Sequence, residues 1–136
     1  MNKDRDHYQV ERVWGLYDVL ANFKNMKVKE LVVNPNSCLS FQKHDHRSEF
    51  WIVNEGIARV ILSHDYPESH NKDSLEKRQQ YVENGSRTIV LHKHDYVHIP
   101  VGEWHQLINP SNKPLSIVEI QYGPMCEEQD IERFYQ

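Results

Sequence analysis

The sequence predicts an all-β protein, either a barrel or a sandwich, and three observations support this prediction. Runs of β-prone residues in the 136-residue chain are short, and each is bounded by glycine, proline or asparagine. Turn residues recur about every 8–12 positions, a spacing typical of β-barrels and β-sandwiches. Long helical patterns do not alternate with these runs, which argues against βαβ units.

The expected strands follow one another closely. The first becomes more buried along its length and ends at Asn34-Pro35-Asn36, where turn-forming residues interrupt it. Asn54-Glu55-Gly56 provides a tight turn between two later strands, and Asn84-Gly85 between β-prone runs is a strong hairpin signal. In chain order, the expected strands are Lys27–Val33, Cys38–Gln42, Glu49–Val53, Ile57–Leu62, Gln79–Val82, Arg87–Leu91, Tyr96–Pro100, Trp104–Ile108 and Leu115–Tyr122.

Three segments depart from this pattern. Leu16–Phe23 and Glu127–Phe134 have helical character, so a short helical segment is expected near each end of the chain. Residues 64–86 form a polar insertion, which cannot bury much surface and is expected on the outside. The chain length fits one compact domain over residues 1–136, because natural domains usually run about 100–150 residues.

The composition excludes several classes of function. There are 16 Lys and Arg against 20 Asp and Glu, a net charge of −4, so we expect no nucleic-acid partner and no anionic membrane partner. Apolar runs such as Ile57–Leu62 are far shorter than the roughly 18 residues of a membrane span, and the N-terminal residues lack the apolar core of a signal peptide. We therefore expect a cytoplasmic protein with Cys38 and Cys126 as reduced thiols.

The histidines indicate a metal site. Polar residues alternate along one expected strand, so in an extended chain their side chains leave by the same face. A Pro-x-Gly turn at residues 100–102 delivers a further histidine from a distant part of the chain. Imidazole nitrogens with a carboxylate oxygen suit Zn²⁺, Mn²⁺, Fe²⁺, Co²⁺ or Ni²⁺. The candidate ligands are His44, His46, Glu49 and His105, with Gln42 on the same alternating face, and no role is assigned to His7, His64, His70, His92, His94 or His98.

These two stretches resemble the paired motifs of the cupin superfamily, which implies a jelly-roll barrel, also called a double-stranded β-helix. Glu49 followed by Gly56 is similar to the end of the first motif, and the pattern Pro100-x-Gly-x-x-His-x-x-x-Asn109 is similar to the second. Asn36 and His94 stand where the glycines that open the two motifs usually lie.

The spacing within the first motif leaves two ligand sets open. Cupins usually place more residues between the second histidine and the glutamate than the two that separate His46 from Glu49. The set is therefore either His44, His46, Glu49 and His105, or Gln42, His44, Glu49 and His105 with His46 in a supporting or catalytic role. We favour the first set, because imidazole binds these metals better than a neutral amide does.

A narrower resemblance, to type II phosphomannose isomerases, covers nearly the whole chain. The stretches that carry it are Val13–Tyr17, Val28–Pro35, Leu39–Trp51, Pro114–Gly123 and Glu128–Arg133. In that family the cupin domain is often fused to a mannose-1-phosphate guanylyltransferase domain. The resemblance implies an enzyme that interconverts mannose 6-phosphate and fructose 6-phosphate and needs one divalent cation. We expect Zn²⁺ ahead of Mn²⁺, Co²⁺, Ni²⁺ or Fe²⁺. Because cupins are commonly dimers, we also expect a homodimer.

Such an isomerase needs a base that moves a proton between neighbouring carbons and a Lewis acid that stabilises their oxygens. Glu119 is the candidate base, unless it is a buried carboxylate paired with arginine or lysine, and Gln121 would orient sugar hydroxyls. Lys29, Arg47 and Arg133 are the expected phosphate ligands.

Two other functions stay open. Cupins with this kind of ligand set can also be Fe(II) oxygenases, because they leave coordination positions open for O₂. A sugar-phosphate-binding cupin without turnover is the second, because Met125–Asp130 departs from the usual ending of the isomerase family.

Overall fold

A computed structural model describes residues 7–63, 86–124 and 126–133, and over these ranges the chain forms strands, turns and loops. The described ranges contain no helix, and the all-β prediction is confirmed. The strands are β1 Tyr8–Arg12, β2 Gly15–Asn22, β3 Met26–Val33, β4 Gln42–Lys43, β5 Ser48–Glu55, β6 Ala58–Ser63, β7 Arg87–Leu91, β8 Tyr96–Ile99, β9 Trp104–Ile108, β10 Leu115–Tyr122 and β11 Glu132–Arg133.

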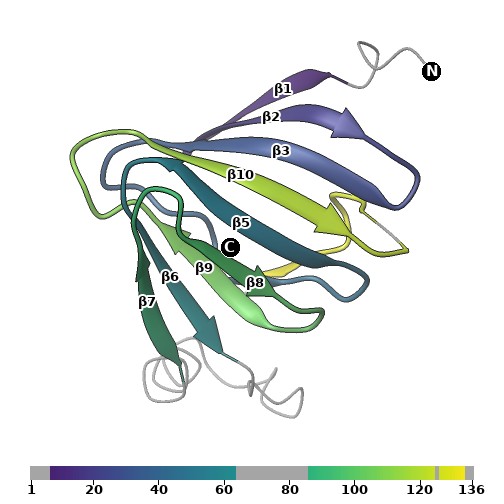
Figure 1. The fold of residues 1–136 in the computed structure, drawn as a ribbon. Helices are drawn as coiled ribbons and strands as arrows, with labels where there is room; N and C mark the ends of the chain where they lie inside the picture. Colours follow the sequence, from purple (N-terminus) through teal and green to yellow (C-terminus); the bar gives the residue numbers. More distant parts are fainter. Residues whose placement is uncertain (1–6, 64–85, 125, 134–136) are drawn as a thin grey trace.

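Two antiparallel sheets form the walls of a jelly-roll barrel (Figure 1). One sheet has the strand order β1-β2-β3-β10-β5-β8, and the other has the order β11-β4-β9-β6-β7. From β3 to β6, and again from β7 to β10, each strand lies in the opposite sheet from the one before it. Strands far apart in sequence, such as β3 and β10, therefore become hydrogen-bonded neighbours.

The inside of the barrel has an apolar half and a polar half. On β10, Ile117 is buried opposite Leu31 and Val53, whereas Glu119, two residues further, lies opposite Lys29. Because side chains alternate along a strand, both Ile117 and Glu119 point inward. The buried polar residues of this second half are Lys27, Lys29, His44, Arg47, Glu49, His105, Glu119 and Gln121. The apolar half supplies a core, and the polar half is left for a site.

The helical segment expected over Leu16–Phe23 is wrong, because this stretch forms strand β2. β2 pairs with β3 along most of its length and buries Tyr17 and Val19 with a period of two. Leucine and alanine favour a helix only weakly, and pairing with a neighbouring strand overrides that preference.

The helical segment expected over Glu127–Phe134 is also wrong for the residues that the structure describes. Turns are closed there by hydrogen bonds from Asp130 N–H to the Glu127 carbonyl (3.1 Å) and from Ile131 N–H to the Gln129 carbonyl (2.9 Å). β11 follows and pairs with β4. The polar groups of this segment bind an earlier loop of the chain, and so they do not build a helix.

Other sequence expectations meet the structure only in part. The strand expected over Cys38–Gln42 reduces to one bridge between Cys38 and Ile108 and to the short β4. The strand expected over Gln79–Val82 lies outside the described residues, as does the polar insertion up to residue 85. Among the described residues, no helix has the length and apolar character needed to cross a membrane.

Asn36 and His94 adopt a backbone conformation that glycine usually provides. Their φ angles are 56° and 72°, in the left-handed region. Asparagine and histidine enter this region more readily than most other residues with a side chain. These are the two positions at which the cupin resemblance placed the opening glycines, so the chain keeps both turns without glycine.

Candidate functional site

The loop between β4 and β5 shapes the polar half of the barrel. β4 is only two residues long, and after it the chain turns so that His44 and Arg47 are buried while Asp45 and His46 are exposed. Gly123, just after β10, approaches this loop so closely that a Cβ there would lie 2.6 Å from the His46 carbonyl oxygen. Within this loop, a turn and not the alternation of a strand therefore decides which side chains face the site.

His44, Glu49 and His105 bring potential metal-ligand atoms within 4.8 Å of one another. The three residues come from the β4–β5 loop, from β5 and from β9. His44 Nε2 lies 3.2 Å from Glu49 Oε2, and His105 Nε2 lies 3.6 Å from Glu49 Oε1. All three side chains are almost fully buried, so an ion held here would be shielded from bulk water.

The hydrogen bonds of the two histidines fix which ring nitrogen carries the proton. His44 Nδ1 donates to the Asp130 carbonyl (2.6 Å), and His105 Nδ1 donates to the Glu103 carbonyl (2.9 Å). A carbonyl can only accept, so each Nδ1 carries the proton and each Nε2 keeps its lone pair. His105 Nε2 is buried without a hydrogen-bond partner.

Burial also keeps both rings neutral. It lowers the pKa of His44 to about 4, with Arg47 adding to the effect, and it lowers the pKa of His105 to about 3, with His44 adding to the effect. Two neutral imidazole nitrogens and one carboxylate are a donor set that fits a divalent cation. The unpartnered Nε2 of His105 is consistent with that use.

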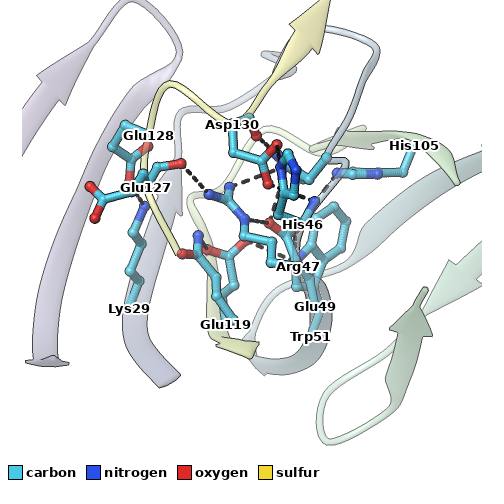
Figure 2. A network of polar contacts seen from close by, with 12 residues as sticks. Lys29, His46, Arg47, Glu49, Trp51, His105, Glu119, Glu127, Glu128 and Asp130 are labelled. Carbon is cyan, nitrogen blue, oxygen red and sulfur yellow. Dashed lines mark hydrogen bonds and ion pairs between the residues drawn. The ribbon is translucent and has the colours of Figure 1, made fainter. Parts of the chain in front are cut away.

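The structure separates the two residues that compete for the fourth ligand position. Gln42 lies opposite His105 in the β4–β9 pairing and lines the same cavity as His44 and Glu49. The His46 side chain is 54% exposed, and its Nδ1 lies 3.0 Å from Asp130 Oδ1 (Figure 2). The expectation that His46 faces inward depended on strand alternation, and β4 ends before His46. The geometry therefore favours the set that contains Gln42.

Glu119 is a buried carboxyl beside the ligand cluster. Trp51 Nε1 donates to Glu119 (2.9 Å) and also to Glu49 (3.1 Å), and Gln121 Nε2 donates to the other oxygen of Glu119 (2.7 Å). Burial first, and then the nearby Glu49 carboxylate, raise the pKa of Glu119 to about 7. Within the described part of the chain no arginine or lysine forms an ion pair with Glu119. Glu119 is thus poised between its two protonation states near neutral pH.

Arg47 connects the ligand cluster to the C-terminal segment. Its Nε donates to Glu49 Oε2 (3.1 Å), and its Nη1 donates to the Glu127 carbonyl (2.8 Å). Its Nη2 lies 3.2 Å from His44 Nε2. Figure 2 shows the guanidinium in the middle of this network. The turn after β4 brings Arg47 inward, which strand alternation alone would not have done.

A cavity of about 310 Å³ lies beside the cluster, within the size range of small-molecule sites. Lys29 forms an ion pair with Glu128, and its ammonium lies 4.2 Å from the centre of the Tyr17 ring. Arg12 lies 5.4 Å from the centre of the same ring. The expected substrate ligands Lys29, Arg47, Gln121 and Arg133 all line this cavity.

Arg12 and Glu128 also line the cavity, although neither was among the expected site residues. No motif or spacing links them to the histidines. The β1–β2 hairpin and the C-terminal segment bring them to the site, and only the fold reveals that placement.

Solved structures share this fold at low sequence identity. CapF, a capsular polysaccharide assembling protein from Staphylococcus aureus, aligns with a TM-score of 0.69 and 15% identity over 93% of this chain and 34% of that chain. Oxalate decarboxylase from Lactobacillus farciminis aligns with a TM-score of 0.69 and 15% identity over 96% of this chain and 34% of that chain. Both comparisons bear on the fold alone.

Curated relatives are closer in sequence. The chain is 34% identical over 130 residues to the alginate biosynthesis protein AlgA of Pseudomonas syringae pv. tomato, covering 96% of this chain and 22% of that protein. It is 32% identical over 133 residues to the mannose-1-phosphate guanylyltransferase of Escherichia coli K12, covering 98% of this chain and 23% of that protein. The chain thus spans less than a quarter of the length of these relatives.

The match to a protein family covers the chain from end to end. The family described as mannose-6-phosphate isomerase C-terminal matches residues 1–81 and 76–136. The matched residues include both halves of the ligand cluster, the β4–β5 loop and β9. The chain therefore belongs to the mannose-6-phosphate isomerase C-terminal family, and its fold is a cupin jelly roll.

Proposed function

We propose that this chain is a metal-dependent isomerase that interconverts mannose 6-phosphate and fructose 6-phosphate. One observation carries the proposal: the carboxyl of Glu119 is buried beside three residues that can hold a metal ion. A proton-transferring group next to a Lewis acid is what aldose–ketose isomerisation requires. Membership of the family supports mannose 6-phosphate as the substrate.

His44, Glu49 and His105 would hold the cation, and Gln42 would supply a further oxygen. When bound, a divalent cation would withdraw electron density from the sugar oxygens at C1 and C2 and so acidify the C2 proton. The Nδ1 hydrogen bonds of both histidines keep the proton off Nε2. The Nε2 of His105 is unpartnered, whereas the Nε2 of His44 accepts from Arg47 Nη2, which would give way to the cation. Zn²⁺ is the first ion to test, followed by Mn²⁺, Co²⁺, Ni²⁺ and Fe²⁺, because nitrogen and oxygen ligands accept all of them.

Glu119 would carry the proton. In its ionised form it accepts the proton from C2 of mannose 6-phosphate, and the electron pair of that bond forms a C1–C2 double bond with negative charge on O1. Glu119 then returns the proton to C1 while the C2 hydroxyl passes its proton to O1, which leaves a ketone at C2. Because Trp51 and Gln121 hold the two carboxylate oxygens, Glu119 keeps one orientation during both transfers.

Cations along the cavity wall would bind the phosphate. Arg12 and Lys29 flank Tyr17, and Arg133 lines the same cavity. A dianionic phosphate would compete with the Glu128 carboxylate for Lys29, since both are anions that pair with the same ammonium. Arg47 would contribute mainly through Glu49, which its Nε contacts.

Conversion of mannose 6-phosphate by chelator-stripped protein reloaded with one metal at a time tests this proposal. We expect fructose 6-phosphate with at least one ion. His105→Ala should lose the activity because it loses a ligand, and Glu119→Gln should lose it because the base is absent. Glu55→Gln, an exposed position on β5, is the matched control and should keep full activity.

Two other results would each overturn the proposal. Tight binding of mannose 6-phosphate without conversion by any metal form would indicate a binding protein. Iron-dependent oxygen consumption without isomerisation would indicate an oxygenase.

A further inference from the structure

One acidic residue of the C-terminal segment, Asp130, contacts the metal-ligand loop at several points. Its side chain is only 3% exposed. Oδ1 accepts a hydrogen bond from Asp45 N–H (3.1 Å), and Oδ2 accepts one from His46 N–H (2.9 Å). Oδ1 also lies 3.0 Å from His46 Nδ1. One carboxylate therefore satisfies two consecutive backbone donors of the turn after β4.

The backbone of the same residue orients a proposed ligand. The Asp130 carbonyl accepts the Nδ1 proton of His44 at 2.6 Å, which leaves His44 Nε2 on the side of Glu49. The carboxylate of Asp130 therefore accepts hydrogen bonds from the backbone of the turn, and its backbone carbonyl accepts one from the His44 ring. Figure 2 shows Asp130 above the cluster, in the turn that precedes β11.

Asp130 does not line the cavity, so it has no direct access to a ligand there. We propose that Asp130 is a positioning residue for the metal centre, which sets metal affinity by fixing the turn over residues 44–47 and the His44 ring. The inference rests on the metal centre of the proposed function. It assigns a role to the C-terminal segment, although that segment lies more than 80 residues away in sequence from the loop it holds.

The physical reason is that the Asp130 carboxylate is the acceptor to which both of these N–H groups are tied in the structure. Without the carboxylate, the N–H groups of Asp45 and His46 lose their acceptor, and the turn can relax to shapes in which His44 and Arg47 no longer face inward together. Residues that hydrogen-bond to metal ligands without contacting the metal typically contribute about 10–100-fold to metal affinity. We expect a loss of that size when the Asp130 side chain is removed.

Co²⁺ titration of the metal-free protein tests the inference, because visible absorption reports both the affinity and the ligand geometry. Asp130→Ala should raise the Kd for Co²⁺ by about 10–100-fold and alter the absorption spectrum. Asp130→Asn keeps one oxygen acceptor but presents N–H groups to the remaining donors, so its Kd should lie between those of the wild type and Asp130→Ala. Gln129→Ala, at the exposed neighbouring position, is the matched control and should bind as the wild type does.

A purely structural role for Asp130 makes a different prediction. It would lower the unfolding temperature of the metal-free protein but leave the Kd and spectrum of the folded variant unchanged, and that result would overturn the inference. If Asp130→Ala does not fold, as judged by near-ultraviolet circular dichroism, Asp130→Asn decides the question by the same two readouts. Failure of the wild-type chain to bind Co²⁺ would instead overturn the metal centre of the proposed function, and the inference with it.

Discussion

Replacing Glu119 with glutamine should remove a loss of stability that the metal-free protein undergoes as the pH rises, and it also removes the proposed base. The raised pKa of Glu119, about 7 against an ordinary value of 4.5, means that the folded state resists ionisation of this carboxyl. Below about pH 4.5 the carboxyl is protonated in both states and has no effect. As the pH rises from 4.5 to 7, the unfolded chain ionises first, so the folded state loses relative stability. Above about pH 7 the loss is complete.

The size of the effect follows from the pKa difference. The difference between a pKa of about 7 and the ordinary value of 4.5 corresponds to roughly 3 kcal/mol, and most of this loss develops between pH 5 and pH 8.5. Glutamine does not ionise, so Glu119→Gln escapes the loss. The lowered pKa values of His44 and His105 act in the opposite direction, since they reduce stability as the pH falls below 6.5. The charge of Glu119 raises both pKa values slightly, so its removal lowers them further. Both rings are already neutral in the folded state at pH 5, so this change contributes little to the difference between the two proteins.

Urea unfolding of the wild type and of Glu119→Gln, each in chelator at pH 5 and at pH 8.5, measures this difference. The free energy of unfolding of the variant, relative to the wild type, should rise by about 2–3 kcal/mol between the two pH values. Glu55→Gln removes an exposed carboxylate and should show a change below about 0.5 kcal/mol. A difference for Glu119→Gln that does not change with pH would refute the reasoning, because it would mean that burial and Glu49 do not disfavour ionisation at this position.

Three further predictions concern the metal ligands, the phosphate-binding residues and the oligomeric state. Metal analysis of the purified variants should find little bound metal in His44→Ala, a reduced metal content in Gln42→Ala and a near wild-type content in His46→Ala. Loss of metal in His46→Ala alone would mean that His46 is a ligand. In steady-state kinetics, Lys29→Gln and Arg12→Gln should each raise the KM for mannose 6-phosphate by about 10–100-fold with a smaller change in kcat, and an unchanged KM would place the phosphate elsewhere. Solution scattering should give twice the chain mass of 16.2 kDa, and a monomer at micromolar concentration would contradict the expected homodimer.

The sequence predicted well those strands in which buried and exposed residues alternate along the chain. The strand with Glu49 and Trp51 buries alternate residues as expected, and the Pro-x-Gly turn at Gly102 delivers His105 inward. The turn at Asn36 was predicted both from its turn-forming neighbours and from the cupin resemblance, whereas His94 was indicated only by that resemblance. Both residues have the positive φ angles that a glycine would usually supply.

The elements that the sequence did not predict depend on contacts between distant segments. The orientation of His46 is set by a turn that Asp130 holds, and no local pattern reveals that hydrogen bond. Arg12 reaches the cavity only because β1 folds back on β2. The same applies to Leu16–Phe23, whose helical character is overridden once β3 offers a partner strand.

Proton NMR of mannose 6-phosphate in D₂O, with the metal-loaded protein, is the decisive experiment for the proposed isomerase. We expect signals of fructose 6-phosphate with the wild type. With Glu119→Gln we expect neither product nor deuterium at C2, even though that variant still binds metal. Absence of both product and deuterium with the wild type under every metal would contradict the assignment of an isomerase. Undiminished conversion by Glu119→Gln would contradict the assignment of its base.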